Sequence, residues 1–511
     1  MADDQRDVIA FLEGKGPGNR LKPDEIIQTH AAIIALYPRE AFKIKRAVKY
    51  DYLDFSTLEQ RQDMLLRELE LNGPAAPGLY RDVAPITKDA RGRLRLGGTG
   101  EVVEWVLRMT RFPVEAELSV IADQGRLTLQ LAEALGRSIA DYHARAAILS
   151  EDGAALVKEI IEELDRVLSG MTNELGGDRV ERVLASLRHA FDGQAELMQA
   201  RGQNGWVRRC HGDLHLHNIV LWNDVPTPFD ALEFDERLGT CDVLYDLAFL
   251  LMDLAHRGLD DAANVAMNAY LSSAESDDHF DGLALLPLYL AVRAAIRAMV
   301  DVQTAAFQED PATLVAVAGG FMEHALDFLR PEPPVLVAIG GLSGSGKTSL
   351  AKQIAAHVGR SPGAVHIRSD LERKAYFGVD PLERLPKAAY APQVSGIIYD
   401  RMREIAKRAL SAGQSVILDS VHATPADRTA AYRISSELEC EFHGFWLDLD
   451  TQMRVSRVQH RARDASDADA EVAQRQADMD LGDIDWIKLD ASRDIADLTK
   501  NVLSIISNKR A

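Results

Sequence analysis

Residues 335–349 read VLVAIGGLSGSGKTS, and this stretch decides the fold of the C-terminal third of the chain. It opens with a continuous apolar run, Val335–Ile339, of the kind that forms a strand buried on both faces. Glycines follow, and then an amphipathic run from Leu350 to Val358 that stops at Gly359, as a helix does. The order of strand, glycine-rich turn and helix predicts the first unit of an α/β domain with a parallel sheet.

The turn carries the spacing G-x-x-x-x-G-K-[ST] of a phosphate-binding loop (P-loop). Glycines let backbone N–H groups point at phosphate oxygens, and the new helix adds the positive end of its dipole. We expect Lys347 to reach the β- and γ-phosphates of a nucleoside triphosphate and the Thr348 hydroxyl to hold Mg²⁺. The residues expected to bind the nucleotide are Gly341, Gly344, Ser345, Gly346, Lys347, Thr348 and Ser349. The alternative is a glycine-rich turn with a chance lysine, but the flanking strand and helix argue against it. ATP is the expected nucleotide, because the sequence has no N-K-x-D guanine signature.

The composition bounds the class of protein. A chain of 511 residues is long enough for two or three cores. The net charge of −20 argues against nucleic acid as a partner. It suits a cationic substrate, or equally an acidic surface that maintains solubility. The cysteines are three, scattered and without a C-x-x-C pair, which fits a reducing cytosol. The acidic N-terminus and the short, interrupted apolar stretches predict no signal peptide and no membrane span, so a cytoplasmic location is expected.

A spacer, Pro331-Glu332-Pro333-Pro334, precedes the P-loop strand. Three prolines in four residues form a stiff, non-helical segment. We therefore predict one domain over residues 1–330, a linker over 331–334 and a second domain over 335–511.

The N-terminal domain begins with β-like runs and ends with helices. Residues 26–36 and 41–49 predict a hairpin turned by Tyr37–Glu40, with Lys43 and Lys45 on one face of its second strand. A helix from about residue 58 to residue 72 follows. The pattern becomes helical over residues 123–200 and again over 242–329, with a break at 207–221.

The break contains a second motif, VRRCHGDLHLHNIVL. His211, Asp213 and Asn218 have the H-x-D-x-x-x-x-N spacing of a kinase catalytic loop. Asp213 would accept the proton of the attacking hydroxyl, and Asn218 and Asp230 would hold the metal. Upstream, Lys43 would be the phosphate lysine, paired with a glutamate of the following helix. The expected pair is Lys43 with Glu68, and Lys45 and Glu70 are the competing candidates.

Two further interpretations concern the same segment. His211, His215 and His217 could hold zinc, but no fourth ligand has a suitable spacing and Asp213 and Asn218 would be unexplained. Asp242 and Asp246 are expected to be structural, as a helix cap or as an anchor of the catalytic loop.

These residues, with Phe229-Asp230 and Asp242-Val243-Leu244-Tyr245-Asp246, resemble the aminoglycoside phosphotransferase family over roughly residues 26–330. The whole chain is similar to bacterial bifunctional proteins in which such a domain is fused to an ATP-binding P-loop kinase domain of AAA or zeta-toxin type. The resemblance implies a two-lobed, protein-kinase-like α+β domain followed by an α/β P-loop domain, with ATP between the lobes of the first. The sequence departs from the family at the first hairpin, where Gln28-Thr29-His30-Ala31 replaces a glycine-rich loop.

Later segments complete the second site. Asp370 follows a predicted strand over residues 364–367 and stands at the position where small P-loop kinases place a catalytic base, with Arg373 to orient the substrate. Alternatively, Ser369 and Glu372 form a capping box and Asp370 serves the helix start. Asp419 ends the strand 415–419 and is expected to bind magnesium.

A helical face of arginines follows the next strand. Arg454, Arg457 and Arg461 recur at helical spacing, with Arg463 just beyond, and resemble the lid of nucleotide and sugar kinases. The alternative is a solvated basic helix that pairs with Asp464, Asp467 and Asp469.

The sequence thus predicts an enzyme with two ATP- and Mg²⁺-dependent phosphotransferase sites that act on hydroxyls of small molecules. One alternative is a single catalytic domain joined to a nucleotide-binding regulatory module. Another is a C-terminal polynucleotide 5′-kinase, which the acidity of the chain disfavours. The sequence identifies neither acceptor and indicates no oligomeric state.

Overall fold

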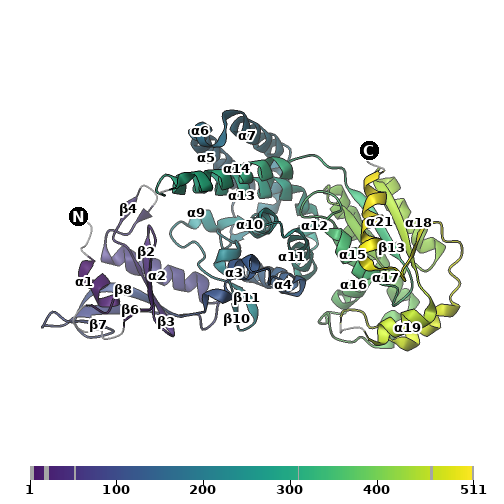
Figure 1. The fold of residues 1–511 in the computed structure, drawn as a ribbon, viewed down its shortest axis with the longest axis horizontal. Coiled ribbons are helices and arrows are strands. Elements are labelled where there is room, and N and C mark those ends of the chain that lie inside the picture. Colours follow the sequence, from purple (N-terminus) through teal and green to yellow (C-terminus); the bar gives the residue numbers. More distant parts are fainter. Residues whose placement is uncertain (1–4, 16–21, 51–52, 309, 461–463, 509–511) are drawn as a thin grey trace. The chain divides into compact units, whose positions relative to one another are not determined.

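The computed structural model describes residues 5–15, 22–50, 53–308, 310–460 and 464–508. Its internal contacts divide the chain into two compact units, Met1–Gly153 with Gly202–Leu250, and Ala154–Arg201 with Leu251–Ala511. Figure 1 labels the elements of both units.

A six-stranded sheet opens the first unit, in the order β1-β2-β3-β8-β6-β7, and every neighbouring pair is antiparallel. The strands are β1 (Glu25–Gln28), β2 (Ala32–Leu36), β3 (Glu40–Lys45), β6 (Tyr80–Lys88), β7 (Leu94–Leu96) and β8 (Glu101–Thr110). The run 26–36 is two strands rather than one, because Thr29 turns the chain: its Oγ1 accepts the N–H groups of Ala31 and Ala32 at 3.3 and 2.9 Å. The predicted turn at Tyr37–Glu40 is confirmed as the β2–β3 connection.

Alternation along β3 separates two cores. Phe42 and Ile44 enter one core together with side chains of α1 (Arg6–Leu12). Ala41 enters the other core, which contains Leu65 of α2 (Leu58–Asn72). Lys43 and Lys45 share the face of Ala41, as predicted, and this face is turned toward α2.

The remainder of the first unit is mixed. The hairpin of β10 (Ile219–Trp222) and β11 (Val225–Pro228) and the pair of β9 (Val207–Arg209) and β12 (Thr240–Asp242) are antiparallel. Other elements are β4 (Lys49–Tyr50), β5 (Leu53–Asp54), η1 (Val114–Ala116), α3 (Leu118–Asp123), α4 (Leu129–Arg145), η2 (Leu216–Asn218) and α9 (Glu236–Gly239). Helix α10 (Val243–His256) begins in this unit.

The second unit combines helices with a parallel sheet. The helices that precede the sheet in sequence confirm the predicted helical regions, and α13 packs against α14. They are α5 (Gly153–Leu168), α6 (Thr172–Leu175), α7 (Gly177–Asp192), α8 (Ala195–Gln203), α11 (Asp260–Ser273), α12 (Asp278–Gly282), η3 (Leu283–Leu285), α13 (Leu286–Ala305) and α14 (Pro311–Phe328). Residues 331–334 join α14 to the first strand of the sheet, and a domain boundary at this spacer stays a prediction.

The sheet has the order β14-β15-β13-β16-β17, and all its strands are parallel. This confirms the predicted α/β domain with a parallel sheet. Its strands are β13 (Val335–Gly340), β14 (Val365–Arg368), β15 (Val416–Asp419), β16 (Glu441–Asp448) and β17 (Ile487–Asp490). Its helices are α15 (Lys347–Ala355), α16 (Ser369–Tyr376), η4 (Lys387–Tyr390), α17 (Pro392–Ser411), α18 (Pro425–Glu437), α19 (Thr451–Gln459), α20 (Ala470–Arg475), η5 (Gln476–Asp478) and α21 (Ile495–Asn508).

Parallel strands place their carboxyl ends along one edge, which is where ligands bind in such sheets. The P-loop follows β13, Asp370 follows β14 and Asp419 ends β15. The apolar residues of β13 pack against α15 and α21 in a buried core beneath this edge.

One helical stretch in the described residues, Asp278–Ala305, is long and apolar enough to cross a membrane. Of its most apolar window, 67% is buried inside the protein, as is usual for a core helix. Buried helices of this kind are weak indicators of a membrane span.

Two candidate nucleotide sites

The first site is built around the two lysines of β3. Lys43 Nζ lies 2.7 Å from Glu68 Oε1 and 2.7 Å from Asp230 Oδ1. Lys45 Nζ lies 2.7 Å from the other oxygen of Glu68 and forms a second ion pair with Glu233. The expected Lys43–Glu68 pair is therefore present, and Lys45 shares the same glutamate. Glu70 pairs with Arg67 instead.

The electrostatics fix the charge states around Lys43. Desolvation lowers the pKa of the Lys43 ammonium, but the carboxylates of Asp230 and Glu68 outweigh it and the pKa is well above its usual value. Desolvation raises the pKa of the Asp230 carboxyl, and the charge and hydrogen bond of Lys43 reverse this effect, so that its pKa is lowered. Both groups are therefore ionised at neutral pH.

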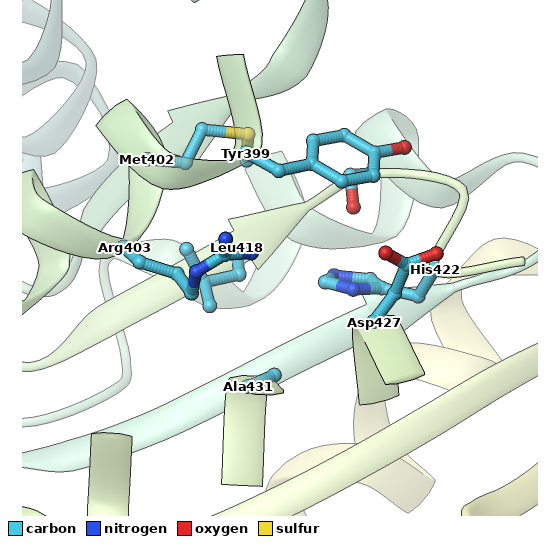
Figure 2. A pocket seen from close by; sticks show the side chains of 8 residues that line it. Tyr399, Met402, Arg403, Leu418, His422, Asp427 and Ala431 are labelled. Atoms are coloured by element: carbon cyan, nitrogen blue, oxygen red, sulfur yellow. The ribbon is translucent and has the colours of Figure 1, made fainter. Parts of the chain in front are cut away.

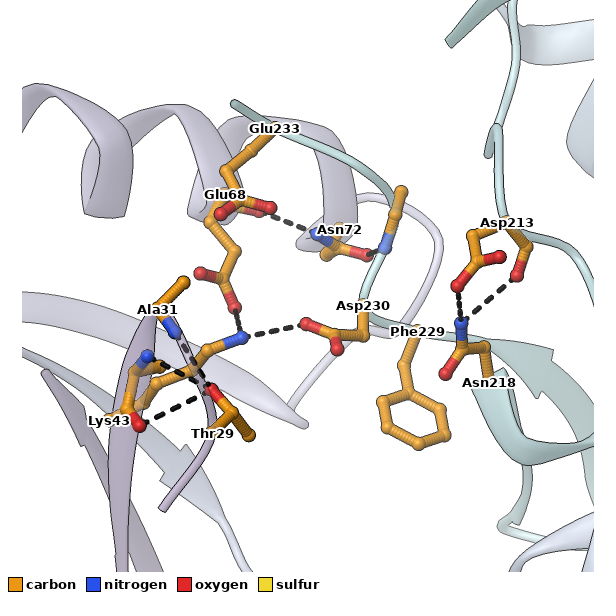
Figure 3. A network of polar contacts seen from close by, with 12 residues as sticks. Thr29, Ala31, Lys43, Glu68, Asn72, Asp213, Asn218, Phe229, Asp230 and Glu233 are labelled. Carbon is orange, nitrogen blue, oxygen red and sulfur yellow. Dashed lines mark hydrogen bonds and ion pairs between the residues drawn. The ribbon is translucent and has the colours of Figure 1, made fainter. Parts of the chain in front are cut away.

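Asp230 is held in an uncommon backbone conformation. Its φ of 61° lies in the left-handed region, which non-glycine residues rarely adopt. Two hydrogen bonds fix this segment: the Asp230 N–H donates to Tyr80 Oη at 3.0 Å, and the Ala231 N–H donates to Asn72 Oδ1 at 2.9 Å. The strain is thus maintained by β6 and by the end of α2, and it turns the Asp230 carboxylate toward Lys43 (Figure 3).

The catalytic-loop residues lie at the ends of the β10–β11 hairpin. Asn218 directly precedes β10, and Phe229-Asp230 directly follows β11. The Phe229 N–H donates to the Asn218 carbonyl oxygen at 2.9 Å, so the hairpin brings the two predicted metal ligands to one place. Asn218 Nδ2 donates to Asp213 Oδ2 at 2.9 Å (Figure 3). The structure therefore brings Asp213, Asn218 and Asp230 together with Lys43 and Glu68.

Asp246 anchors the catalytic loop, as expected. Its carboxylate accepts the N–H groups of His211 and Gly212 at 3.0 and 2.9 Å. Asp242 caps α10, because its Oδ1 accepts the Leu244 N–H at 2.8 Å. Both aspartates are structural, which confirms their predicted role.

The zinc interpretation of the three histidines has no geometric support in the described part of the chain. His211 contacts the Phe229 carbonyl oxygen, His215 contacts Asp213 and His217 contacts Glu117. Within the described residues, three possible metal ligands do lie close together, and all three are buried: His143, Cys210 and Asp246. Asp246 is already used there as the anchor of the loop.

Sequence reasoning missed two residues of this site. Glu233 pairs with Lys45 and is buried, and desolvation raises the pKa of its carboxyl. Tyr80 supports Asp230, and burial raises the pKa of its hydroxyl far above the usual value. No spacing rule marks either residue, because each is brought in from a different segment by tertiary packing.

The second site is the P-loop at the end of β13. Gly344 and Gly346 have φ angles of 85° and 97°, and a Cβ on Gly344 would lie 2.5 Å from the Arg454 carbonyl oxygen. Only glycine allows this path. Lys347 Nζ donates to the Leu342 carbonyl oxygen at 3.3 Å, within the loop. The loop therefore has the conformation that the sequence motif requires.

Thr348 and Asp419 meet at the foot of the loop. Thr348 Oγ1 donates to Asp419 Oδ2 at 2.7 Å, and His366 Nε2 lies 3.2 Å from the same oxygen. Desolvation raises the pKa of the Asp419 carboxyl, but His366, Arg368 and Lys347 lower it far below its usual range. A hydroxyl oxygen beside an ionised carboxylate is the kind of donor set that Mg²⁺ prefers, so these residues fit the expected ion. His366 was not predicted: it is the second residue of β14, and its contact with Asp419 depends on β14 lying beside β15.

Asp370 is in the first turn of α16, which begins at Ser369 without a side-chain cap, so the alternative capping box is absent. Desolvation raises the pKa of the Asp370 carboxyl, against the attraction of Arg368. Arg373 is buried: its Nη1 donates to the Ala389 carbonyl oxygen at 2.7 Å, and its guanidinium stacks on Tyr390 at 4.7 Å. In this conformation Arg373 supports the segment around η4.

The two described arginines of α19 contact the P-loop. Arg454 Nη1 and Arg457 Nη1 lie 3.4 Å from the carbonyl oxygens of Ser343 and Ser345. Arg461 and Arg463 lie outside the described residues. The alternative pairing of this helix with the following aspartates is wrong for the described pairs, since these aspartates contact other cations. The observed pairs are Asp464 with Arg368, Asp467 with Lys374 and Asp469 with Arg384.

A narrow pocket follows β15 and is lined by α17 and α18. His422 has a φ of 48° and lies between Tyr399 and Asp427 (Figure 2). Burial lowers the pKa of the His422 imidazole to about 4, so the ring is neutral at pH 7. The pocket is small, and its accessible surface is mainly apolar.

Comparison with known proteins gives three results. Residues 336–479 match the family model described as an AAA domain. An uncharacterized protein of Mycobacterium tuberculosis H37Rv is 28% identical over 470 residues, which cover 90% of this chain and 91% of that protein. Among solved structures, aminoglycoside 2'-phosphotransferase-IIIa aligns over 63% of this chain and 99% of its own, with 12% identity and a TM-score of 0.38. A gluconokinase from Sinorhizobium meliloti 1021 aligns over 35% and 94%, with 19% identity and a TM-score of 0.24.

Topology and site geometry define the architecture. The chain combines an α+β part, built on an antiparallel sheet, with an α/β P-loop domain built on a parallel sheet.

Proposed function

We propose that the chain is an ATP- and Mg²⁺-dependent phosphotransferase with two nucleotide sites, each of which transfers the γ-phosphoryl group to a hydroxyl of a small molecule. The observation that carries the proposal is the position of Lys43 Nζ, 2.7 Å from both Glu68 and Asp230, residues that are 25 and 187 positions away in the sequence. Kinases use such a lysine–glutamate pair to orient phosphates beside a metal-binding aspartate. A purely structural ion pair would have no need of the adjacent Asp213–Asn218 loop.

In the N-terminal site, Lys43 would orient the phosphates and Asp213 would accept the proton of the attacking hydroxyl. Asn218 Nδ2 orients the Asp213 carboxylate by a hydrogen bond at 2.9 Å, as a positioned base requires. Asn218 Oδ1 and Asp230 would hold Mg²⁺, which supplies neutralisation of phosphate charge when bound.

In the C-terminal site, Lys347 and the loop N–H groups would bind the phosphates, and Thr348 and Asp419 would hold Mg²⁺. Asp370 would receive the proton of the acceptor. Burial raises the pKa of its carboxyl, which makes it a stronger base than a solvated aspartate. The described arginines of α19 lie on the P-loop, near the charge that develops during transfer.

A second candidate function for the C-terminal part is nucleotide binding without transfer. It is favoured by Arg373, whose guanidinium is buried in contacts with Ala389 and Tyr390 and is not presented to a substrate. Asp370 distinguishes the two functions, because a binding module has no use for a base.

The test is a phosphoryl-transfer screen of the full chain with γ-labelled ATP over hydroxylated metabolites, aminoglycosides and oligonucleotides. Transfer that is lost in Asp213→Asn or in Asp370→Asn assigns an acceptor to one site. Absence of transfer to every small hydroxyl compound, with nucleotide binding retained, would contradict the proposal, and labelling of oligonucleotide ends alone would favour a polynucleotide kinase. A cytoplasmic location is part of the same proposal, supported by the three free cysteines.

A further inference from the structure

Strand β14 is at the edge of the parallel sheet, so one side of its backbone has no neighbouring strand. Edge strands leave N–H and C=O groups that need partners. Here the partner is helix α11, which comes from the region that the sequence assigns to the first domain. Both elements lie in the second compact unit.

Two asparagines one turn apart on α11 contact the first part of this edge and the residues just before it. Asn264 Nδ2 donates to the carbonyl oxygens of Pro362 and Ala364 at 2.9 and 3.0 Å. Asn268 Nδ2 donates to Ala364 O at 3.1 Å, and Asn268 Oδ1 accepts the His366 N–H at 2.7 Å. An asparagine side chain carries the donor and acceptor of a peptide group, so the pair replaces a short stretch of a neighbouring strand.

The last of these hydrogen bonds leads to the nucleotide site. Asn268 holds the backbone of His366, and the imidazole Nε2 of His366 lies 3.2 Å from Asp419 Oδ2. That same oxygen accepts the Thr348 hydroxyl at 2.7 Å. Three successive contacts therefore connect α11 to the residues placed at the magnesium position.

A second set of contacts joins the same region to α16. Arg401 of α17 donates with both Nη atoms to the Asp277 carboxylate, each at 3.0 Å, and with Nε to Glu372 at 2.8 Å. Glu372 is two residues from Asp370 on α16. The helix that carries the proposed base is thus also tied to residues before the proline-rich spacer.

We infer that α11 contributes to metal binding at the C-terminal nucleotide site, and that Asn268 is a positioning residue that holds His366 against Asp419. The edge of the P-loop sheet would then be covered by helix α11 of the same chain. The inference rests on the proposed metal-binding role of Asp419, and it extends that role across the predicted domain boundary. Residues that orient a metal ligand from the outer shell commonly change metal affinity when they are substituted.

The test measures how the binding of a fluorescent ATP analogue to the full chain depends on Mg²⁺ concentration. Only the part of the binding that Lys347→Ala removes is counted, because that part belongs to the C-terminal site. Asn268→Leu is expected to raise the Mg²⁺ concentration for half-saturation by about 3- to 10-fold, with nucleotide affinity in EDTA unchanged. Asn268→Asp keeps an acceptor for the His366 N–H and is expected to restore most of the Mg²⁺ affinity. Asn264→Leu is the matched control, because it breaks the hydrogen bonds to Pro362 and Ala364, just before β14, and one from Asn268 Nδ2, but none to His366. Ser273→Ala, exposed on the same helix, controls for substitution alone.

Equal Mg²⁺ half-saturation in Asn268→Leu and Asn264→Leu, with both variants folded by thermal melting, would overturn the inference and leave α11 as a packing helix. If Asn268→Leu does not fold, His366→Gln takes its place, and an unchanged Mg²⁺ dependence there overturns the inference equally. Failure of the proposed function is separate: it would appear as unaltered Mg²⁺ dependence in Asp419→Asn.

Discussion

Glu68 divides its two carboxylate oxygens between Lys43 and Lys45, at 2.7 Å each. The two lysines occupy the same face of β3, so a sequence pattern cannot decide which of them serves the phosphates. The two lysines differ in the second carboxylate with which each forms an ion pair. Lys43 contacts Asp230, whose side chain remains 45% exposed, whereas Lys45 contacts Glu233, whose side chain is 9% exposed. We therefore propose that Lys43 contacts the nucleotide and that Lys45 supports Glu68.

The first prediction separates these two roles. Lys45→Met should destabilise the chain by about 3–5 kcal/mol, because it leaves buried carboxylates without their cation. Lys43→Met should cost less stability, since Lys45 still neutralises Glu68 and water can reach Asp230, but it should remove transfer by the N-terminal site. Urea denaturation and single-site turnover measure the two effects. A larger loss of stability in Lys43→Met than in Lys45→Met would reverse the assignment.

The second prediction concerns Asp213. Asp213→Asn keeps the shape of the side chain and should leave fold and ATP binding intact, while transfer by the N-terminal site falls by about a hundredfold or more, as loss of a positioned base does. Asp224→Asn, in the exposed β10–β11 turn, is the control. Single-turnover rates on an acceptor found in the screen measure the effect, and wild-type turnover in Asp213→Asn would show that this loop is not catalytic.

The third prediction uses the neutral imidazole of His422, whose pKa of about 4 lies below the usual 6.5. A lowered pKa means that the unfolded state takes up the proton first as pH falls, so this contribution to stability is complete above pH 6.5 and declines toward pH 4. Between pH 7 and pH 5 the wild type should lose about 1–2 kcal/mol more than His422→Asn, a substitution that tolerates positive φ. Urea denaturation at both pH values tests this, with His460→Asn as an exposed control. Equal pH dependence of wild type and His422→Asn would refute it.

At the scale of elements, strand ends explain why part of the C-terminal site could be predicted. An apolar run that ends in a polar residue marks the carboxyl edge of a parallel sheet, and Asp419 and the P-loop were located by that rule. His366 escaped it, because its role depends on which strands are neighbours: β14 lies beside β15, and this order is a tertiary property. Arg373 was located by the D-x-x-R spacing, but that spacing does not reveal that its guanidinium is buried under Tyr390.

Helix α19 gives the fourth prediction. Arg454 is 2% exposed and donates to the carbonyl oxygens of Ser343 and Ala473 at 3.4 and 3.1 Å. Arg454→Met should leave these acceptors unpaired, cost about 1–3 kcal/mol of stability and weaken nucleotide binding at the P-loop. Thermal melting and nucleotide titration of the full chain measure this, with Arg475→Met on α20 as an exposed control. Unchanged nucleotide affinity would make α19 independent of the loop.

At the scale of the whole molecule, the sequence was a good guide to fold class, and the division into domains at the spacer stays a prediction. Motif order predicted an α+β part followed by a P-loop part with a parallel sheet, and both are present. The proline-rich spacer at 331–334 predicts a domain boundary. Within the second compact unit, Asn264 and Asn268 of α11, which precedes the spacer, contact the backbone at the start of β14 and just before it. Such contacts come from single side chains on helix faces, for which no local pattern exists.

The most direct test of the central claim, two nucleotide sites in one chain, is calorimetric titration of a non-hydrolysable ATP analogue with Mg²⁺ into the full chain. The account predicts two sites per wild-type chain, one in Lys347→Ala, one in Lys43→Met and none in the double variant, with folding of each checked by thermal melting. The two single variants remove phosphate-binding cations from different sites, so their effects should add. A stoichiometry of one in the wild type, or an unchanged stoichiometry in Lys347→Ala, would contradict the account.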